Sequence, residues 1–358
     1  MPDGGILHMV AYDVSRGAER YARALVDALN RAGPETHSMM TLFRGDESTL
    51  RPDHALDVPR GALRALGLDP RVVVRMRGVI RDTRPHSLVA HGGEPAKYAA
   101  FAARGLAPYA YLAIGSSHPR LSNPLRRSLR KSYLERAAAI VAVSDALAEE
   151  IRREAPSVAG RVRIIPNGRD PQVYRPGPRS RGRAPSILFV GHFDDQKRPM
   201  LFVDAIQSVV SAGAGVSATM VGGGPLLEDV GDRAAPLGIR VIGPRDDVPE
   251  LMRDADLLVV TSRPPEGLPG VLIEAGLSGL AVVTTDVPGA RDVVEDGVTG
   301  RVVPVDDELA LFSAVADLVS DTGKREEMGR RARERCLARF TIEATVGTWR
   351  ETLAGMTR

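Results

Sequence analysis

Short apolar runs alternate with segments of helical periodicity along this chain. The alternation starts near the first residues, breaks off near the middle of the chain and then starts again. The first run, Ile6–Tyr12, ends at a glycine-containing turn, and apolar residues at helical spacing follow over 19–32. Short apolar runs suit parallel strands that are buried on both faces. A repeated order of strand, turn and helix therefore predicts a doubly wound α/β fold.

A change of composition divides the chain into two parts. Residues 176–185 contain only Pro, Gly, Ser, Arg and Ala, which is typical of a linker. The apolar run 187–190 then restarts the alternation, and 358 residues suit two domains. We predict two Rossmann-like domains that face each other across a cleft. The predicted segments are a first domain over 1–176, a linker over 177–186, a second domain over 187–340, and a C-terminal helix over 341–358 that packs back on the first domain.

The overall composition narrows the class of protein. A hydrophobic content of 43% with 26% charged residues indicates a globular protein that can form hydrophobic cores. No apolar run is long enough to span a membrane, and no signal-peptide pattern opens the chain, so a cytoplasmic location is expected. The single cysteine, Cys336, predicts no internal disulfide and no zinc cluster. An aromatic content of only 4% argues against nucleic acid as a partner.

Arginine-rich segments lie in the first half of the chain, over 64–84 and 120–131. Such runs are most often the solvated faces of helices. The alternative is peripheral contact with anionic lipid headgroups at the inner face of the membrane.

Residues 263–279 carry the strongest functional signal. Prolines and a glycine between 264 and 267 prevent a helix before about residue 268, while Pro269 has the φ value of a first helical position. A helix that begins here offers free backbone N–H groups and little side-chain bulk, as an anion site such as a phosphate site requires. The amides expected to be free belong to Gly267, Leu268, Gly270 and Val271.

Glu274 is the unusual residue of this stretch. Its neighbours one turn away are apolar or small, so the helix is expected to be buried between layers. A carboxylate in such a place needs a hydrogen-bond donor, and a diol such as a ribose is a natural partner. A purely electrostatic role near the start of the helix is the alternative.

Several short motifs stand in a defined order along nearly the whole chain. They are Gly17-Ala-Glu19, Val143-Ser144, Pro166-Asn-Gly168, Val190-Gly191, Gln196-Lys197, Val221-Gly-Gly-Gly-Pro225, Gly279-Leu-Ala-Val-Val283 and the pair Glu266-x7-Glu274. Each motif is weak alone, but their order and spacing together are specific. In these motifs the chain resembles the retaining GT-B glycosyltransferases of family 4, also called glycosyl transferases group 1.

The resemblance implies transfer of a sugar, with retention of configuration, from a nucleotide-diphosphate sugar to a hydroxyl acceptor. It implies that Lys197 contacts the donor diphosphate, that Glu266 holds hydroxyls of the sugar, and that Glu274 holds the ribose. Further implied donor contacts are Gly267, Leu268, Pro269 and Gly270 at the phosphates or sugar, Gly243 and Arg245 at the nucleobase, and Arg16 and Gly17 near the leaving phosphate.

The resemblance places His118, or less strongly His91, near the reacting carbon, so the implied catalytic set is His118, Glu266 and Lys197. His91 and Glu94 are weaker candidates for acceptor contacts. One departure concerns His192, where the family usually has an arginine. A histidine provides positive charge only when protonated, which predicts weaker or pH-dependent donor binding, and a structural histidine is the alternative.

No metal or other cofactor is expected. No Asp-x-Asp stands in a loop suited to Mg²⁺, because 254–256 lies at the entrance of an expected strand. Without a metal, cations and oriented amides must stabilise the charge on the departing phosphate.

Three other functions are compatible with a fold of this class to different degrees. A nicotinamide dehydrogenase is disfavoured because the first turn lacks Gly-x-Gly-x-x-Gly. An epimerase or phosphorylase of the same fold would share the phosphate site. A scaffold that binds nucleotide sugar without turnover is supported only by His192.

Overall fold

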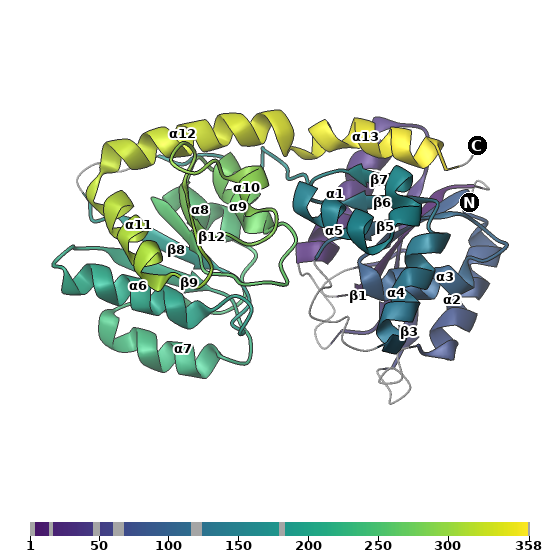
Figure 1. Ribbon diagram of the computed structural model, residues 1–358, viewed down its shortest axis with the longest axis horizontal. Coiled ribbons are helices and arrows are strands. Elements are labelled where there is room, and N and C mark those ends of the chain that lie inside the picture. The colour runs from purple at the N-terminus through teal and green to yellow at the C-terminus, as the bar shows by residue number, and fades with distance from the viewer. Residues whose placement is uncertain are drawn as a thin grey trace. The chain divides into compact units, whose positions relative to one another are not determined.

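The computed structural model describes residues 4–13, 17–45, 51–59, 68–115, 124–178 and 183–356, with the backbone alone at residues 125 and 126. The chain forms two compact units, one made of 1–168 with 342–358 and the other of 169–341 (Figure 1). It therefore passes between the units twice, at 168/169 and at 341/342. The first of these passages lies a few residues before the segment that composition marks as a linker.

The first unit contains a seven-stranded sheet with the order β3-β2-β1-β4-β5-β6-β7. Every pair of neighbouring strands is parallel. The strands are β1 (Ile6–Tyr12), β2 (His37–Phe43), β3 (His54–Val58), β4 (Ser87–His91), β5 (Tyr109–Ala113), β6 (Ala139–Ala142) and β7 (Val162–Ile164).

The helices of the first unit begin where the sequence supplies caps. The Ser144 hydroxyl accepts a hydrogen bond from the Leu147 amide at the start of α5. The Asp69 carboxylate accepts one from the Arg71 amide at the start of α2. The helices are α1 (Gly17–Ala32), α2 (Pro70–Thr83), α3 (Gly93–Ala102), α4 (Pro124–Arg136), α5 (Asp145–Glu154), the 3-10 helix η3 (Pro156–Arg161) and α13 (Ile342–Ala354).

Helix α13, at the C-terminal end of the chain, belongs to the first unit and packs against α1. Trp349 is fully buried, and its indole Nε1–H donates to the Tyr21 hydroxyl at 3.1 Å. A buried tryptophan whose N–H is paired anchors a helix well, because its apolar area is large and no polar atom is left unsatisfied.

The second unit contains a six-stranded parallel sheet with the order β10-β9-β8-β11-β12-β13. The strands are β8 (Ser186–Val190), β9 (Ser217–Val221), β10 (Arg240–Ile242), β11 (Leu257–Val260), β12 (Ala281–Thr285) and β13 (Arg301–Val303). The helices are α6 (Pro199–Ser211), α7 (Leu227–Ala234), the 3-10 helix η4 (Ala235–Leu237), α8 (Val248–Asp254), α9 (Gly270–Leu277), α10 (Ala290–Val293), α11 (Glu308–Ser320) and α12 (Thr322–Arg339).

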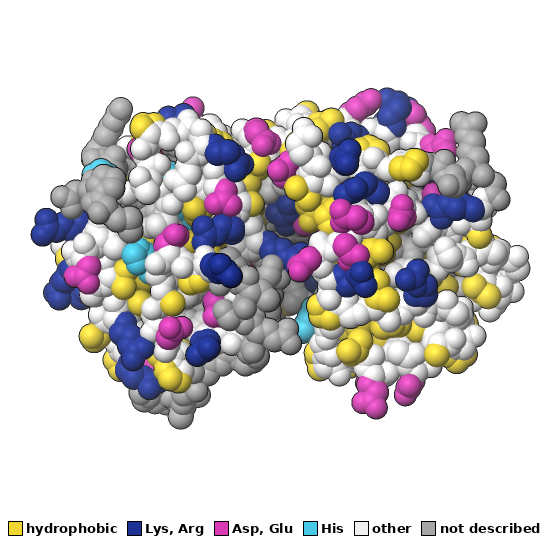
Figure 2. All heavy atoms as spheres, turned by 180° about the vertical axis from the view of Figure 1, so that it is seen from behind, with side chains coloured by type: hydrophobic (Ala, Val, Ile, Leu, Met, Phe, Trp, Pro, Cys, Tyr) yellow, Lys and Arg dark blue, Asp and Glu magenta, His cyan; other side chains and the backbone are white. Residues whose placement is uncertain are grey.

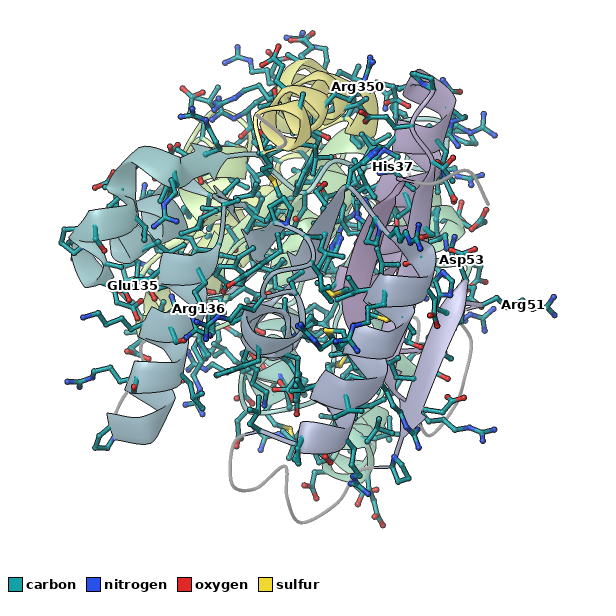
Figure 3. All side chains as sticks on the ribbon, turned by 90° about the vertical axis from the view of Figure 1, so that its right-hand side faces the viewer. His37, Arg51, Asp53, Glu135, Arg136 and Arg350 are labelled. Atoms are coloured by element: carbon teal, nitrogen blue, oxygen red, sulfur yellow. The ribbon has the colours of Figure 1, made fainter. Side chains whose placement is uncertain are left out.

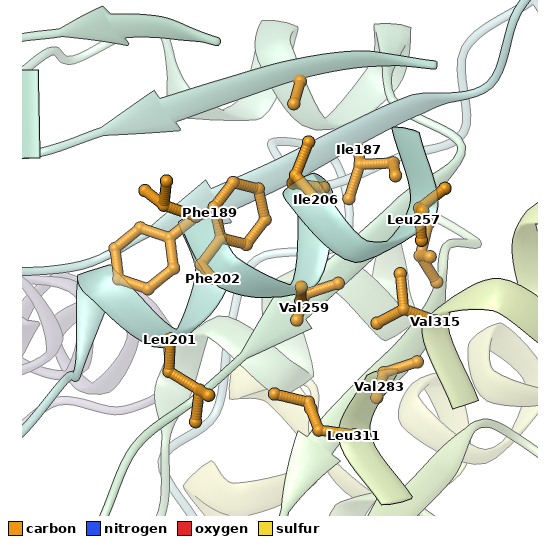
Figure 4. Packing of buried hydrophobic residues seen from close by; sticks show 14 of the residues in the cluster. Ile187, Phe189, Leu201, Phe202, Ile206, Leu257, Val259, Val283, Leu311 and Val315 are labelled. Atoms are coloured by element: carbon orange, nitrogen blue, oxygen red, sulfur yellow. The ribbon is translucent and has the colours of Figure 1, made fainter. Parts of the chain in front are cut away.

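The core of the second unit lies between its strands and the helices α6 and α11. Phe189 and Phe202 pack ring against ring with centroids 5.5 Å apart, and Val259, Val283 and Leu311 extend the same cluster (Figure 4). Strands buried in this way on both faces explain why the sequence shows continuous apolar runs instead of alternation.

Both sheets have the doubly wound topology that the sequence predicts, so the predicted α/β class is confirmed. The strand order reverses between β1 and β4 in the first sheet and between β8 and β11 in the second. At such a point the two loops that leave the carboxyl ends of neighbouring strands diverge and leave a crevice, where α/β folds bind ligands.

Candidate functional site

The loops that follow β8 and β11 meet through an ion pair at the reversal point of the second sheet. Lys197 Nζ lies 2.5 Å from Glu266 Oε1, with 22% and 12% of the two side chains exposed. The other carboxylate oxygen, Glu266 Oε2, is buried and has no hydrogen-bond partner among the described residues. Sequence analysis singled out both residues, and the fold brings them together because β8 and β11 are neighbours.

A set of hydrogen bonds fixes the two loops to each other. The Gln196 side-chain amide donates to the Pro265 carbonyl at 3.1 Å, and the Arg263 amide donates to the Gln196 carbonyl at 2.8 Å. The Thr261 hydroxyl lies 2.7 Å from the Lys197 carbonyl. These bonds hold the backbone on both sides of the ion pair, which limits how far either charged group can move.

Helix α9 follows this loop and begins one residue later than the sequence suggested. Pro269 is the residue before the helix, not its first residue, because its ψ of 107° is extended. The Leu272 amide donates to the Pro269 carbonyl at 3.0 Å. Within the described chain, no acceptor is recorded for four nearby amides, which is the property expected of an anion site. They belong to Gly267, Leu268, Gly270 and Val271.

Glu274 has a partner that sequence analysis missed. Its Oε1 accepts a hydrogen bond from Arg169 Nε at 2.8 Å, and 15% of the Glu274 side chain is exposed. A Cβ atom added to Gly270 would collide with the Arg169 guanidinium, so the arginine lies over the first turn of α9. The only signal available in the sequence was the position of Arg169 directly after Pro166-Asn-Gly168.

Two residues at and just after the carboxyl end of β12 contact the loop between β11 and α9. Gly289 has a φ of 81°, and a Cβ atom there would collide with the Gly267 carbonyl oxygen. The Thr285 hydroxyl donates to the Ser262 carbonyl at 2.5 Å. The glycine permits both a left-handed backbone and close approach of the loop.

The remaining predicted donor residues follow the neighbouring strands at the same edge of the sheet. His192 is exposed in the loop after β8, beside Gly224. Gly243 and Arg245 are exposed after β10, and the Arg245 guanidinium binds both carboxylate oxygens of Asp247 at 2.6 Å. Parallel topology thus gathers the loops after β8, β9, β10 and β11 at one edge.

In the first unit, His91 ends β4 and is part of a buried chain of imidazoles. Its Nε2 lies 3.0 Å from His8 Nδ1, and His8 Nε2 lies 3.0 Å from His37 Nδ1. Which nitrogen donates depends on the tautomer. Burial lowers the pKa of His91 to about 3 and that of His37 to about 4. His91 Nδ1 has no hydrogen-bond partner among the described residues.

Glu94 lies in the first turn of α3, with its carboxylate 3.0 Å from Lys97 Nζ. Gly17 is the first residue of α1. Both follow strands at the reversal point of the first sheet. Two other predicted site residues, Arg16 and His118, lie outside the described residues.

Many guanidinium groups of the arginine-rich segments serve the first unit internally. Arg130 is buried and donates to both carboxylate oxygens of Glu154 at 2.7 Å. Arg77 donates to backbone carbonyls, and so does Arg136, which lies just after the second segment at the end of α4 and is labelled in Figure 3. Figure 2 shows basic side chains interspersed with acidic ones on the face that it draws. Contact of these segments with an anionic membrane surface stays a prediction.

The described residues include no group of three or more His, Cys, Asp or Glu side chains arranged to hold a metal ion. None of their helices combines the length and the apolar character needed to cross a bilayer.

Family models match both halves of the chain. The model described as Glycosyltransferase Family 4 matches residues 15–173, and the model described as Glycosyl transferases group 1 matches residues 184–321. The phosphatidyl-myo-inositol mannosyltransferase of Mycolicibacterium smegmatis is 28% identical over 352 residues, which cover 92% of this chain and 88% of that protein. The alpha-D-kanosaminyltransferase of Streptomyces kanamyceticus is 26% identical over 261 residues, which cover 66% of this chain and 67% of that protein.

Solved structures agree with these matches at the level of the fold. Anabaena HepE in complex with UDP and glucose has a TM-score of 0.81 at 20% identity, over 98% of this chain and 99% of that one. The sucrose-phosphate synthase of Thermosynechococcus elongatus has a TM-score of 0.80 at 21% identity, also over 98% and 99%. With both units, both family models and these relatives in agreement, the chain belongs to family 4 of the GT-B glycosyltransferases, which transfer sugars from nucleotide-sugar donors.

Proposed function

We propose that this chain is a retaining, metal-independent hexosyltransferase that moves a sugar from a nucleotide-diphosphate sugar to a hydroxyl group. The observation that carries the proposal is the ion pair of Lys197 and Glu266 beside the first turn of α9. The pair combines a cation, a buried carboxylate oxygen and nearby backbone amides at the reversal point of a parallel sheet.

The proposed donor lies along this edge with its diphosphate at the first turn of α9. Lys197 and the free amides stabilise the negative charge that develops on the departing phosphate, and fixed groups of this kind need no reorganisation during the reaction. Glu266 accepts a hydroxyl of the sugar through Oε2, and Glu274 faces the ribose. Gly243 and Arg245 contact the nucleobase, and His192 lies at the diphosphate.

The proposed transfer proceeds by attack of the acceptor oxygen on the anomeric carbon from the side of the leaving group. The bond from that carbon to the diphosphate breaks as the new glycosidic bond forms, and a phosphate oxygen takes the acceptor's proton. His118, with His91 and Glu94 as weaker candidates, is proposed to contact the acceptor side. One relative is named for a phosphatidyl-myo-inositol acceptor, which supports testing lipid acceptors at the inner face of the membrane.

The first test is a thermal-shift panel of the wild-type protein with UDP, GDP, ADP, dTDP and NAD. UDP leads the panel because solved HepE structures contain it. One nucleoside diphosphate should raise the melting temperature and NAD should not, because a ligand that binds only the folded state stabilises it.

Transfer from the matching nucleotide sugar should then be measured with and without EDTA. Unchanged activity in EDTA supports the metal-independent mechanism, whereas a loss that Mg²⁺ or Mn²⁺ restores contradicts it. A product of inverted configuration contradicts retention. No stabilisation by any nucleotide in the panel contradicts the proposed function as a whole.

A further inference from the structure

Arg169 is the charged residue that the proposed donor site does not yet use. It is the first residue of the second unit, and its Nε–H donates to Glu274 Oε1 at 2.8 Å. Only 12% of the Arg169 side chain and 15% of the Glu274 side chain are exposed. A largely buried ion pair gains little net stability, because desolvation offsets most of the attraction. The pair therefore calls for a role other than stabilisation.

Backbone contacts with residues 340 and 341 fix the position of Arg169. Its amide donates to the Phe340 carbonyl at 2.9 Å, and Arg169 forms a parallel bridge with Thr341. Because the backbone is held, the reach of the side chain is limited to one part of α9.

That part is the first turn of α9. The guanidinium occupies the space that a Cβ atom at Gly270 would need. Gly270 and Glu274 are four residues apart and therefore lie on the same face of the helix. The guanidinium thus bridges from the carboxylate to the turn in which the Gly270 amide has no recorded acceptor among the described residues.

A cation at this place meets the chemical needs of a diphosphate. Helix amides and a guanidinium both attract phosphate oxygens, and a guanidinium can bind two of them at once. A guanidinium has five N–H donors and no acceptor, so its chemistry suits an anionic ligand. An arginine carries its charge at every physiological pH, so this cation does not depend on a change of protonation.

We propose that Arg169 binds the donor diphosphate together with the first turn of α9, and that Glu274 orients the guanidinium for this contact. The inference rests on the proposed function, because it needs a nucleoside diphosphate at this edge. It predicts that position 270 requires glycine, because a Cβ atom there would occupy the space that the guanidinium fills.

The test compares binding of a nucleoside diphosphate with binding of its own nucleoside. Titration calorimetry with UDP and uridine, or with whichever pair stabilises the wild type, should be run on Arg169→Ala, Arg169→Lys and Glu274→Gln. Arg233→Ala is the matched control, since its guanidinium pairs with Asp204 at 2.6 Å elsewhere in the same unit.

Arg169→Ala should weaken diphosphate binding by about 10- to 100-fold, the range for one charge-assisted hydrogen bond, while nucleoside binding changes less than about twofold. Arg169→Lys should fall between wild type and Arg169→Ala, because it keeps the charge but not the planar fork. Glu274→Gln should lower diphosphate affinity in the same direction, and Arg233→Ala should match the wild type.

Two outcomes would overturn the inference. Equal losses for the diphosphate and the nucleoside would show that Arg169 acts on the ribose end or on the fold, and unchanged diphosphate affinity in Arg169→Ala would show that it has no role in binding. If Arg169→Ala does not fold, Arg169→Lys decides by the same comparison. Failure of the wild type to bind any nucleotide is a different result, because it contradicts the proposed function itself.

Discussion

The ion pair of Lys197 and Glu266 joins a group suited to phosphate with a group suited to sugar hydroxyls. Its distance of 2.5 Å and its partial burial make it a strong charge-assisted hydrogen bond. Without the lysine, the Glu266 carboxylate would be an unpaired charge in a largely buried place. The pair therefore gives the Glu266 carboxylate a charged partner and leaves its second oxygen for a further donor.

We predict that Glu266→Gln lowers kcat by about 10- to 100-fold, because a charged acceptor for the sugar hydroxyl becomes a neutral one. Diphosphate affinity should change by less than about threefold, since Lys197 and the α9 amides remain. Steady-state kinetics combined with nucleotide titration separates the two effects. Glu250→Gln is the control, since its carboxylate pairs with Arg253 in α8. A parallel fall in kcat and diphosphate affinity would assign Glu266 to holding Lys197 instead.

At the scale of single residues, the sequence pointed to Lys197, Glu266 and Glu274, but it did not indicate that Arg169 pairs with Glu274. Arg169 and Glu274 are separated by 105 positions in the chain. Spacing along one helix or one loop indicates local neighbours, whereas this contact depends on where the chain enters the second unit. A resemblance based on short motifs could not supply it.

The loop between β11 and α9 depends on other elements for its shape. Gly289, just before α10, has no room for a side chain because the Gly267 carbonyl lies against it. The shape of the proposed donor site therefore depends on the turn after β12.

We predict that Gly289→Ala destabilises the protein more than Gly297→Ala does. Both glycines have a left-handed backbone, with φ of 81° and 77°, so both alanines carry a similar backbone cost of about 1 kcal/mol. Only Gly289 lies against backbone atoms, whereas an added Cβ at Gly297 meets nothing within 4 Å. Denaturant unfolding should show a difference of about 1–3 kcal/mol between the variants. Equal destabilisation would mean that the loop moves away at no cost.

At the scale of elements, long periodic helices and continuous apolar strands were predictable, and short elements were not. Strand β13 has only three residues and is defined by its pairing with β12. Helix α3 begins at Gly93 and includes Pro95, so its first turn carries a weak local helix signal. Tertiary contacts decide such cases because the local signal is too short to compete.

At the scale of the whole molecule, three hydrogen-bonded buried histidines lie in the first unit. His8, His37 and His91 lie on three neighbouring strands of the first sheet, and burial lowers the pKa of each below the ordinary value near 6.5. For His8, the neighbouring histidines lower the pKa further. The unfolded chain therefore binds more protons than the folded unit at mildly acidic pH.

We predict that the first unit loses stability as the pH falls from about 6.5 toward 4. The loss begins near the unfolded pKa and amounts to at most about 1.4 kcal/mol per pH unit for each histidine. Calorimetric scans between pH 7 and 5 should show one unfolding transition moving to lower temperature more steeply than the other, because two compact units need not unfold together.

A variant identifies the groups responsible. His8→Leu removes the middle histidine and should reduce the dependence on pH, even if it lowers stability at pH 7. His86→Gln, which changes an exposed histidine of the same unit, should keep the wild-type dependence. An unchanged pH dependence in His8→Leu would contradict the assignment, and His37→Gln provides a second measurement if His8→Leu does not fold.

The sequence by itself determined the two-part α/β architecture and the approximate start of α9, and it pointed to Lys197, Glu266 and Glu274 as candidates for the donor site. It could do so because apolar periodicity, glycine and proline positions and motif spacing are local properties that survive in one dimension. The tertiary structure alone decided which charges meet: Lys197 with Glu266, Arg169 with Glu274, and His8 with His37 and His91. Those contacts depend on the order of strands in a sheet and on the burial that this order produces, which no local pattern specifies.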